Sequence, residues 1–188
     1  MSECEYGKAD DAPGEGDLTD DTLDRMREVL DEHGYLSWLG VELEQATRGR
    51  AVMTLSYREE LANAVAGSTG GLHGGIPATL IDTASGFALR TTFEEPRRVA
   101  LTTTDLDISY LRPGTADLRV ESEVARAGET IGVTRASVTS VAPDGDRKEV
   151  AIGTTTYRLF REGDGDSEDA SASNETIQIT DREGEEDR

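Results

Sequence analysis

Apolar residues recur at helical spacing in two separate segments of the chain. The first segment places four of them three or four positions apart, at Leu23, Met26, Val29 and Leu30. This spacing predicts an amphipathic helix that Thr19 or Asp20 caps and that Gly34 ends. The second segment, 78–89, is apolar on most sides, and Pro77 suits its first turn. It predicts one long buried helix.

Six further segments alternate between apolar and polar residues, which is typical of half-buried strands. Two of them begin at Val41 and Arg50, and four follow the apolar helix at 100–111, 116–127, 130–141 and 149–160. This order predicts an α+β fold in which a curved antiparallel sheet of about five or six strands wraps around one long central helix. Between the first helix and the strands lies the only tryptophan, Trp38, which we expect to pack on the core.

The composition changes sharply at both ends of the chain. Residues 1–17 and 163–188 are acidic and nearly free of core-forming side chains, so they are predicted to be a disordered leader and a disordered tail. One domain, 18–162, remains between them. No apolar run approaches the roughly 20 residues that span a bilayer, and no basic-then-apolar signal opens the chain. We therefore expect a cytoplasmic protein without a membrane partner.

Charge is the strongest signal in the composition. Asp and Glu number 39 against 19 Lys and Arg, for a net charge of −20, and only Lys8 and Lys148 are lysines. Such a surface suits molar salt, where a Debye length of about 3 Å screens self-repulsion. Because phosphate binding requires a basic patch, a nucleic-acid partner is disfavoured. The single cysteine, Cys4, cannot form an internal disulfide, and four-cysteine metal sites are excluded.

Two features of residues 71–84, GLHGGIPATLIDTA, have chemical meaning. Glycines at a helix start let a ligand approach unpaired backbone N–H groups, which can stabilise an oxyanion; the alternative is an ordinary turn with no ligand. Asp82 is a carboxylate within an apolar helix. If it is buried it needs a partner or a function, and a buried carboxylate can act as a base near neutral pH; the alternative is that it faces solvent.

His73 cannot be the partner of Asp82 within one chain. Nine residues of helix separate them by about 13.5 Å along the axis and half a turn around it. Two such helices packed antiparallel across a twofold axis would bring Asp82 of one chain near the His73 end of the other. The sequence thus suggests a homodimer with two equivalent sites.

The LHGG motif at 72–75, with an Asp nine residues after the His, resembles the phenylacetate-degradation (PaaI-like) branch of the hotdog-fold acyl-coenzyme A thioesterases. The resemblance extends to residues 106–114, LDISYLRPG, and to the RAG motif at 126–128, and covers roughly residues 35–161. It implies hydrolysis of an acyl-coenzyme A thioester by water with no metal or other cofactor. It also implies a homodimer that forms the active site, and we expect two dimers to pair into a homotetramer.

The same resemblance implies a role for each candidate residue. Asp82 of one subunit is the general base or nucleophile, the N–H of Gly74 polarises the thioester carbonyl, and His73 fixes the loop and the thioester. Thr103 is expected to orient the attacking water, and Asn63 to position water or substrate. Four further residues are expected to contact the substrate: Gly75, Arg112, Arg126 and Gly128.

Two other functions compete with this one. A hydratase on the same fold would need a differently placed acid–base pair, which the start of the central helix lacks. A non-catalytic acyl-coenzyme A-binding hotdog protein is the stronger alternative, and binding without turnover would favour it. A DNA-binding version would need a further module, for which the acidic leader is too short and too negative.

Overall fold

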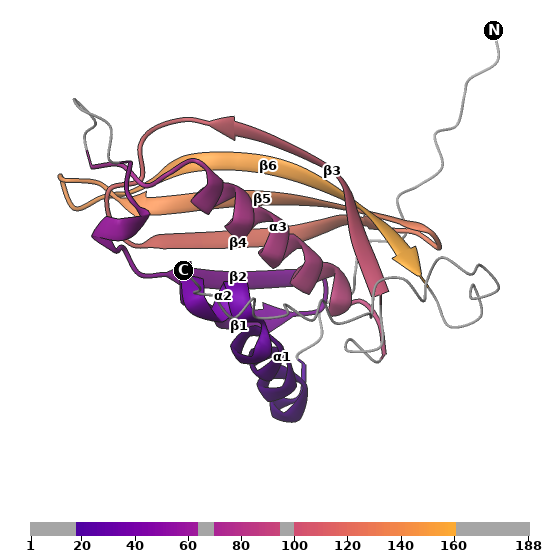
Figure 1. The fold of residues 1–188 in the computed structure, drawn as a ribbon. Helices are drawn as coiled ribbons and strands as arrows, with labels where there is room; N and C mark the ends of the chain where they lie inside the picture. Colours follow the sequence, from indigo (N-terminus) through magenta and orange to yellow (C-terminus); the bar gives the residue numbers. More distant parts are fainter. Residues whose placement is uncertain (1–17, 64–69, 95–99, 161–188) are drawn as a thin grey trace, which may run out of the picture.

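A computed structural model describes residues 18–63, 70–94 and 100–160 of the chain. Two α-helices and six strands were expected, and all of them are present, together with a short additional helix (Figure 1). The helices are α1 (Asp20–Glu32), α2 (Gly34–Leu39) and α3 (Gly75–Arg90), with a short 3₁₀ turn, η1, at Glu59–Leu61. The strands are β1 (Val41–Thr47), β2 (Arg50–Leu55), β3 (Ala100–Tyr110), β4 (Leu118–Ala127), β5 (Ile131–Val141) and β6 (Arg147–Phe160).

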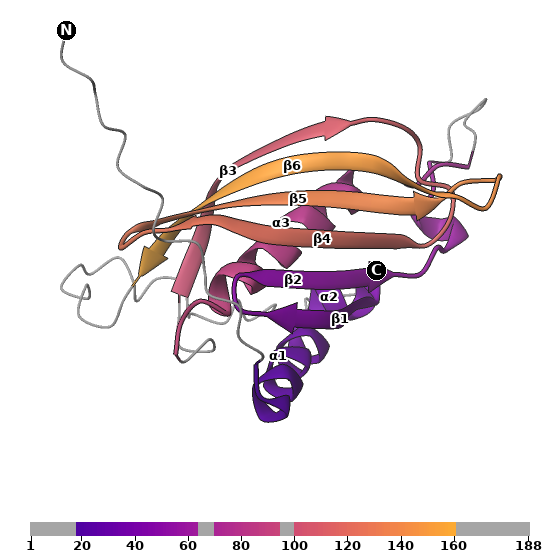
Figure 2. The ribbon, with the colours of Figure 1, turned by 180° about the vertical axis from the view of Figure 1, so that it is seen from behind.

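The six strands form one antiparallel sheet in the order β1-β2-β4-β5-β6-β3. The sheet curves around α3, which lies across its concave face (Figure 1). This is the hotdog arrangement that the sequence predicted. Seen from behind, the convex face carries no helix among the described residues (Figure 2). Strand β3 is an edge strand, paired only with β6.

Two glycines on the sheet let α3 pack close to it. A Cβ atom on Gly132 of β5 would lie 2.6 Å from the side chain of Leu89, and one on Gly153 of β6 would lie 3.2 Å from that of Ile81. Leu89 and Ile81 are both fully buried. Because Ile81 precedes Asp82, the close packing of Ile81 over Gly153 fixes how deep the Asp82 backbone lies in the fold.

The start of α1 is as predicted, but its end is not. Thr19 is the N-cap and accepts a hydrogen bond from the Thr22 N–H at 3.2 Å. Gly34 does not end the helix. The extended backbone of His33 ends it, and Gly34 begins α2, where the His33 imidazole accepts from the Leu36 N–H. The side-chain cap thus takes the place of the expected glycine stop.

The expectation that Trp38 packs on the core is wrong, because 62% of it is exposed. A helix of six residues buries one face, and α2 buries Leu36 and Leu39 instead. The indole lies between the Tyr35 ring, 6.4 Å away, and the Arg58 guanidinium, 5.7 Å away. The leader and the tail lie outside the described residues, as does most of the Gly-rich loop before Leu72. None of the described helices combines the length and the apolar character needed to cross a bilayer.

Candidate active site

The loop that leads into α3 is held in place from both sides. The His73 N–H donates to the Leu61 carbonyl at 2.9 Å, and the Leu72 N–H donates to the Gly114 carbonyl at 2.8 Å. On the far side, the Tyr110 hydroxyl of β3 donates to the Gly74 carbonyl at 2.8 Å. These bonds fix the direction in which the N–H groups at the helix start point.

One N–H group at this helix start is left without an acceptor. The Gly75 N–H donates to Nδ1 of His73 at 3.0 Å, and the Ile76 N–H donates to the His73 carbonyl at 2.9 Å. Within the described ranges, the Gly74 N–H donates to nothing. It is therefore available to an oxygen of a bound molecule, and it lies at the positive end of the α3 dipole.

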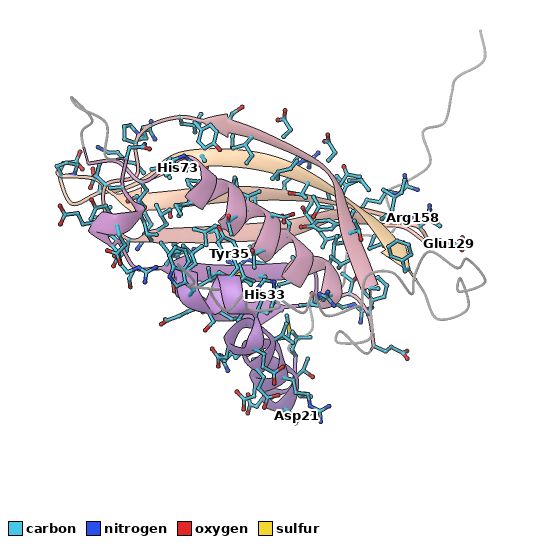
Figure 3. The ribbon with its side chains drawn as sticks, in the orientation of Figure 1. Asp21, His33, Tyr35, His73, Glu129 and Arg158 are labelled. Atoms are coloured by element: carbon cyan, nitrogen blue, oxygen red, sulfur yellow. The ribbon has the colours of Figure 1, made fainter. Side chains whose placement is uncertain are left out.

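The His73 side chain is exposed at the start of α3, where Figure 3 shows it. Because its Nδ1 accepts from Gly75, the proton of the neutral imidazole must be on Nε2. In this form the outward nitrogen is a hydrogen-bond donor. His73 can thus support an acceptor, such as a carbonyl oxygen, but Nδ1 is occupied and is not free to act as a base.

Asp82 lies in the middle of α3, half-buried, and two hydroxyl groups hold one of its oxygens. The Thr103 hydroxyl of β3 donates to Oδ1 at 2.7 Å, and the Tyr157 hydroxyl of β6 donates to the same oxygen at 2.9 Å. No described residue donates to Oδ2. Asp82 therefore combines an anchored oxygen with an open one, which is an arrangement suited to proton transfer.

The structure brings the predicted pair Asp82 and Thr103 together, and it adds Tyr157, which the sequence analysis missed. The alternating pattern of β6 could have indicated that Tyr157 points inward. Thr155, Tyr157 and Leu159 alternate in β6 and are all buried. An inward phenol needs a hydrogen-bond partner. What the pattern lacked was any indication that the partner would be a carboxylate on α3.

Burial, and then the negative charge of Asp82, raise the pKa of the Tyr157 phenol above its usual value. The unfolded chain would lose this proton near pH 10, but the folded chain retains it. The free energy of unfolding should therefore fall above about pH 10, by up to about 1.4 kcal/mol per pH unit. Denaturant unfolding at pH 9, 10 and 11 measures this slope. In Tyr157→Phe it should be shallower; equal slopes in both proteins would contradict the assignment.

A groove of about 350 Å³ runs along α3 beside Asp82. Its wall near Asp82 is polar, with Thr79, Thr103 and Tyr157, and it continues toward Phe87, Leu101 and Arg90. Burial lowers the pKa of Arg90 from its usual value. A mid-helix glycine, Gly86, forms part of the groove, and a Cβ atom there would make only ordinary contacts, the closest at 3.5 Å. Packing within the chain does not require this glycine.

A second pocket, of about 490 Å³, lies beside the His73 loop. Three predicted residues line it: Asn63, Gly74 and Arg112. The Arg112 guanidinium also donates to the Glu149 carbonyl. Asp82 and Thr103 are not part of this pocket, since they line the groove along α3. Within one chain, Asp82 and Thr103 therefore lie in a different cavity from Asn63, Gly74 and Arg112.

Arg126 lies near the end of β4, and Gly128 opens the turn that follows it to β5. The Gly128 N–H donates to the Ile131 carbonyl at 2.9 Å, and a Cβ atom on Gly128 would lie 3.7 Å from Nε of Arg126. Figure 3 places the neighbouring Glu129 at the opposite end of the sheet from His73. Within one chain, this turn is thus remote from the His73 loop. Gly75, in contrast, lies beside His73, because its N–H donates to the His73 imidazole.

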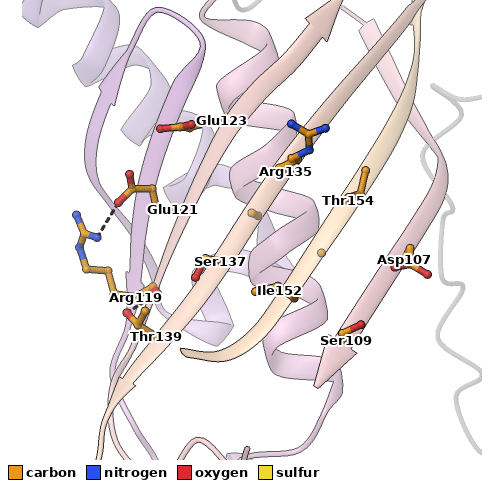
Figure 4. Close-up of a pocket in the computed structure, with 12 residues that line it drawn as sticks. Asp107, Ser109, Arg119, Glu121, Glu123, Arg135, Ser137, Thr139, Ile152 and Thr154 are labelled. Carbon is orange, nitrogen blue, oxygen red and sulfur yellow. Dashed lines mark hydrogen bonds and ion pairs between the residues drawn. The ribbon is translucent and has the colours of Figure 1, made fainter. Parts of the chain in front are cut away.

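A further depression, of about 530 Å³, lies on the convex face of the sheet (Figure 4). Charged and hydroxyl side chains line it, and Arg119 forms ion pairs there with Glu121 and Glu44 at 3.1 and 2.9 Å. It contains no predicted site residue. Among the described side chains, no three His, Cys, Asp or Glu gather in a way that could hold a metal ion.

Comparison with known proteins points to the same region of the chain as the site. A profile of the thioesterase superfamily matches residues 69–144, which include the His73 loop, α3 and Thr103. The chain is 42% identical to a candidate esterase of Halobacterium salinarum over 145 residues, 76% of this chain and 95% of that protein. It is 31% identical to acyl-coenzyme A thioesterase 13 of Homo sapiens over 104 residues, 54% of this chain and 69% of that protein.

The solved structures include the PaaI protein of the Escherichia coli phenylacetic acid degradation operon. It superposes with a TM-score of 0.61 and 22% identity, covering 74% of this chain and 93% of that one. At this identity the likeness concerns the fold.

Proposed function

Because the chain belongs to the thioesterase superfamily, we propose that it hydrolyses an acyl-coenzyme A thioester to a free acid and coenzyme A. The observation that carries the proposal is the Asp82 carboxylate, which lines the groove along α3 and has Oδ1 held by Thr103 and Tyr157, while no described residue donates to Oδ2. A carboxylate in this setting is suited to take a proton from water.

The proposed site needs two copies of the chain. Asp82 and the free N–H of Gly74 both suit thioester hydrolysis, but they line separate cavities. An antiparallel pairing of two α3 helices across a twofold axis would join Asp82 of one copy to the Gly74 loop of the other, twice. Edge strand β3 supports this pairing, because its outer side is unpaired and Leu106 and Tyr110 are exposed there.

The reaction follows from these groups. The thioester carbonyl oxygen accepts from the Gly74 N–H, and the Nε2–H of His73 supports the thioester. Oδ2 of Asp82 takes a proton from water as the water oxygen adds to the carbonyl carbon. The negative charge on the carbonyl oxygen is stabilised at the helix start. The carbon–sulfur bond then breaks, and the thiolate of coenzyme A takes up the proton held by Asp82. Asn63 and Thr103 position the water.

The two cavities suit the two parts of the substrate. The groove past Gly86 toward Phe87 and Leu101 would receive the acyl group, since its far part is partly apolar. Arg112 lies beside the Gly74 loop and Arg126 near the end of β4, and we expect each to meet a phosphate of coenzyme A. Because the chain carries −20, an anionic substrate is repelled at low ionic strength. The affinity should therefore rise in concentrated salt.

Thiol release from short, medium and aromatic acyl-coenzyme A substrates in multimolar KCl tests the proposal. Saturable release that depends on enzyme concentration is expected for at least one class. The alternative, a non-catalytic acyl-coenzyme A-binding protein, predicts saturable binding with no release from any substrate of the panel. Analytical ultracentrifugation of the same sample should give a dimer or a tetramer; an active monomer would contradict the shared site.

A further inference from the structure

Tyr157 touches the proposed base, although the reaction above gives it no task. It belongs to β6, the strand next to the edge strand β3 that carries Thr103. The two residues are paired across these strands, and both hydroxyls reach Oδ1 of Asp82. The same phenol hydroxyl also donates to the backbone carbonyl of Asp82, so its hydrogen is shared between two acceptors of this residue. No other described side chain contacts both the backbone and the carboxylate of this residue.

The phenol is a fixed donor. It is 2% exposed and lies under α3, so water does not compete for its hydrogen bond. Since burial and the Asp82 charge raise its pKa, it stays protonated at any pH where the enzyme would work. A protonated phenol has a single hydrogen to donate, and its acceptors here are both on Asp82. The Tyr157 hydroxyl therefore donates only to atoms of Asp82.

Two donors fix a carboxylate more firmly than one. With Thr103 alone, the group could rotate about its Cβ–Cγ bond and exchange its two oxygens, because a threonine hydroxyl on an exposed edge strand can follow either one. The phenol prevents this rotation, since it is held rigidly in β6 and reaches Oδ1 from a second direction at 2.9 Å. Oδ2 then has one orientation in the side chain that lines the groove.

We propose that Tyr157 is a positioning residue that holds Oδ1 of Asp82, so that Oδ2 alone is presented to the water that attacks the thioester. This inference rests on the proposed function. It distinguishes the two oxygens of the base: Oδ1 is structural, and Oδ2 takes the proton. It also distinguishes the two hydroxyls, because Thr103 is accessible to substrate and water while Tyr157 is not.

The test is Tyr157→Phe, which removes only the hydroxyl. We expect kcat to fall about tenfold with KM within about twofold, because a loosened base lowers the fraction of productive geometry. A fall in kcat without a matching rise in KM distinguishes a misplaced base from a fold that is loosened as a whole, because loosening of the groove would also weaken substrate binding. The control is Tyr57→Phe, which removes a part-buried phenol hydroxyl that donates to the Gly70 carbonyl. The Tyr57→Phe variant should keep the wild-type kcat and KM.

A second comparison separates positioning from general loosening of the fold. In the Asp82→Asn background, Tyr157→Phe should leave the residual rate unchanged, because there is no base left to position. A tenfold fall in that background too would overturn the proposal. If the wild type releases no thiol from any substrate, the proposed function fails. If the wild type is active and Tyr157→Phe keeps its kcat, only this inference fails.

Discussion

Replacing Asp82 with asparagine is expected to lower kcat by about 10² to 10⁴-fold, the range associated with loss of a general base. The amide oxygen can still accept from Thr103 and Tyr157 as Oδ1 does, so the geometry of the site should persist. What is lost is the ability of the second position to take a proton. KM should change little, because no substrate contact is removed. Steady-state thiol release over a range of substrate concentrations measures both quantities.

The matched control for this variant is Asp107→Asn. Asp107 lies on β3, the strand that carries Thr103, but it is exposed at the convex face, in the depression shown in Figure 4. The Asp107→Asn substitution removes the same charge from the other side of the molecule and should leave kcat within about twofold. Both variants should keep the wild-type oligomeric state. Turnover at the wild-type rate in Asp82→Asn would refute the mechanism.

Replacing Gly74 with proline should lower kcat by about 10² to 10³-fold, the loss seen when one oxyanion donor is removed. The substitution fits the backbone, because Gly74 has φ −58° and proline prefers about −65°. It removes an N–H that has no acceptor among the described residues, so no internal hydrogen bond is lost. The rate loss should therefore far exceed any loss of stability, which thermal unfolding of the variant would measure.

Gly74→Ala is the control for the added carbon. A Cβ atom at this position would lie 3.6 Å from the Tyr110 ring, an ordinary contact, and the N–H would remain. The alanine variant should keep most of the activity. If alanine and proline lower kcat equally, the effect is steric, and the Gly74 N–H is not the oxyanion donor.

The fold could be predicted well because its signals are local and periodic. The alternating segments became β3 to β6 within a few residues of their expected ends, and the apolar stretch after Pro77 became α3. Errors occurred where tertiary contacts override local preference. Gly34 does not end α1 because the His33 side chain supplies the next cap, and Trp38 is exposed because Leu36 and Leu39 take the buried face of α2.

The candidate site could be predicted only in part. Asp82 was identifiable because a carboxylate in an apolar helix needs an explanation, and Thr103 followed from the family resemblance. Tyr157 lies 75 positions from Asp82 along the chain, and only the register of β6 under α3 reveals their contact. Helix geometry alone separates Asp82 from His73 within one chain, and for this reason the sequence suggested that a second copy of the chain joins them.

Subunit complementation tests most directly the central claim, that each site combines Asp82 of one copy with Gly74 of another. Asp82→Asn and Gly74→Pro proteins, each nearly inactive, would be unfolded together, refolded as a mixture and assayed. In a mixed dimer, one site carries both substitutions and the other carries neither. Random pairing should therefore restore about a quarter of the wild-type rate per chain, since half the dimers are mixed and each has one intact site. If each chain instead held a complete site, every site would carry one substitution, and the mixture would be as inactive as its components.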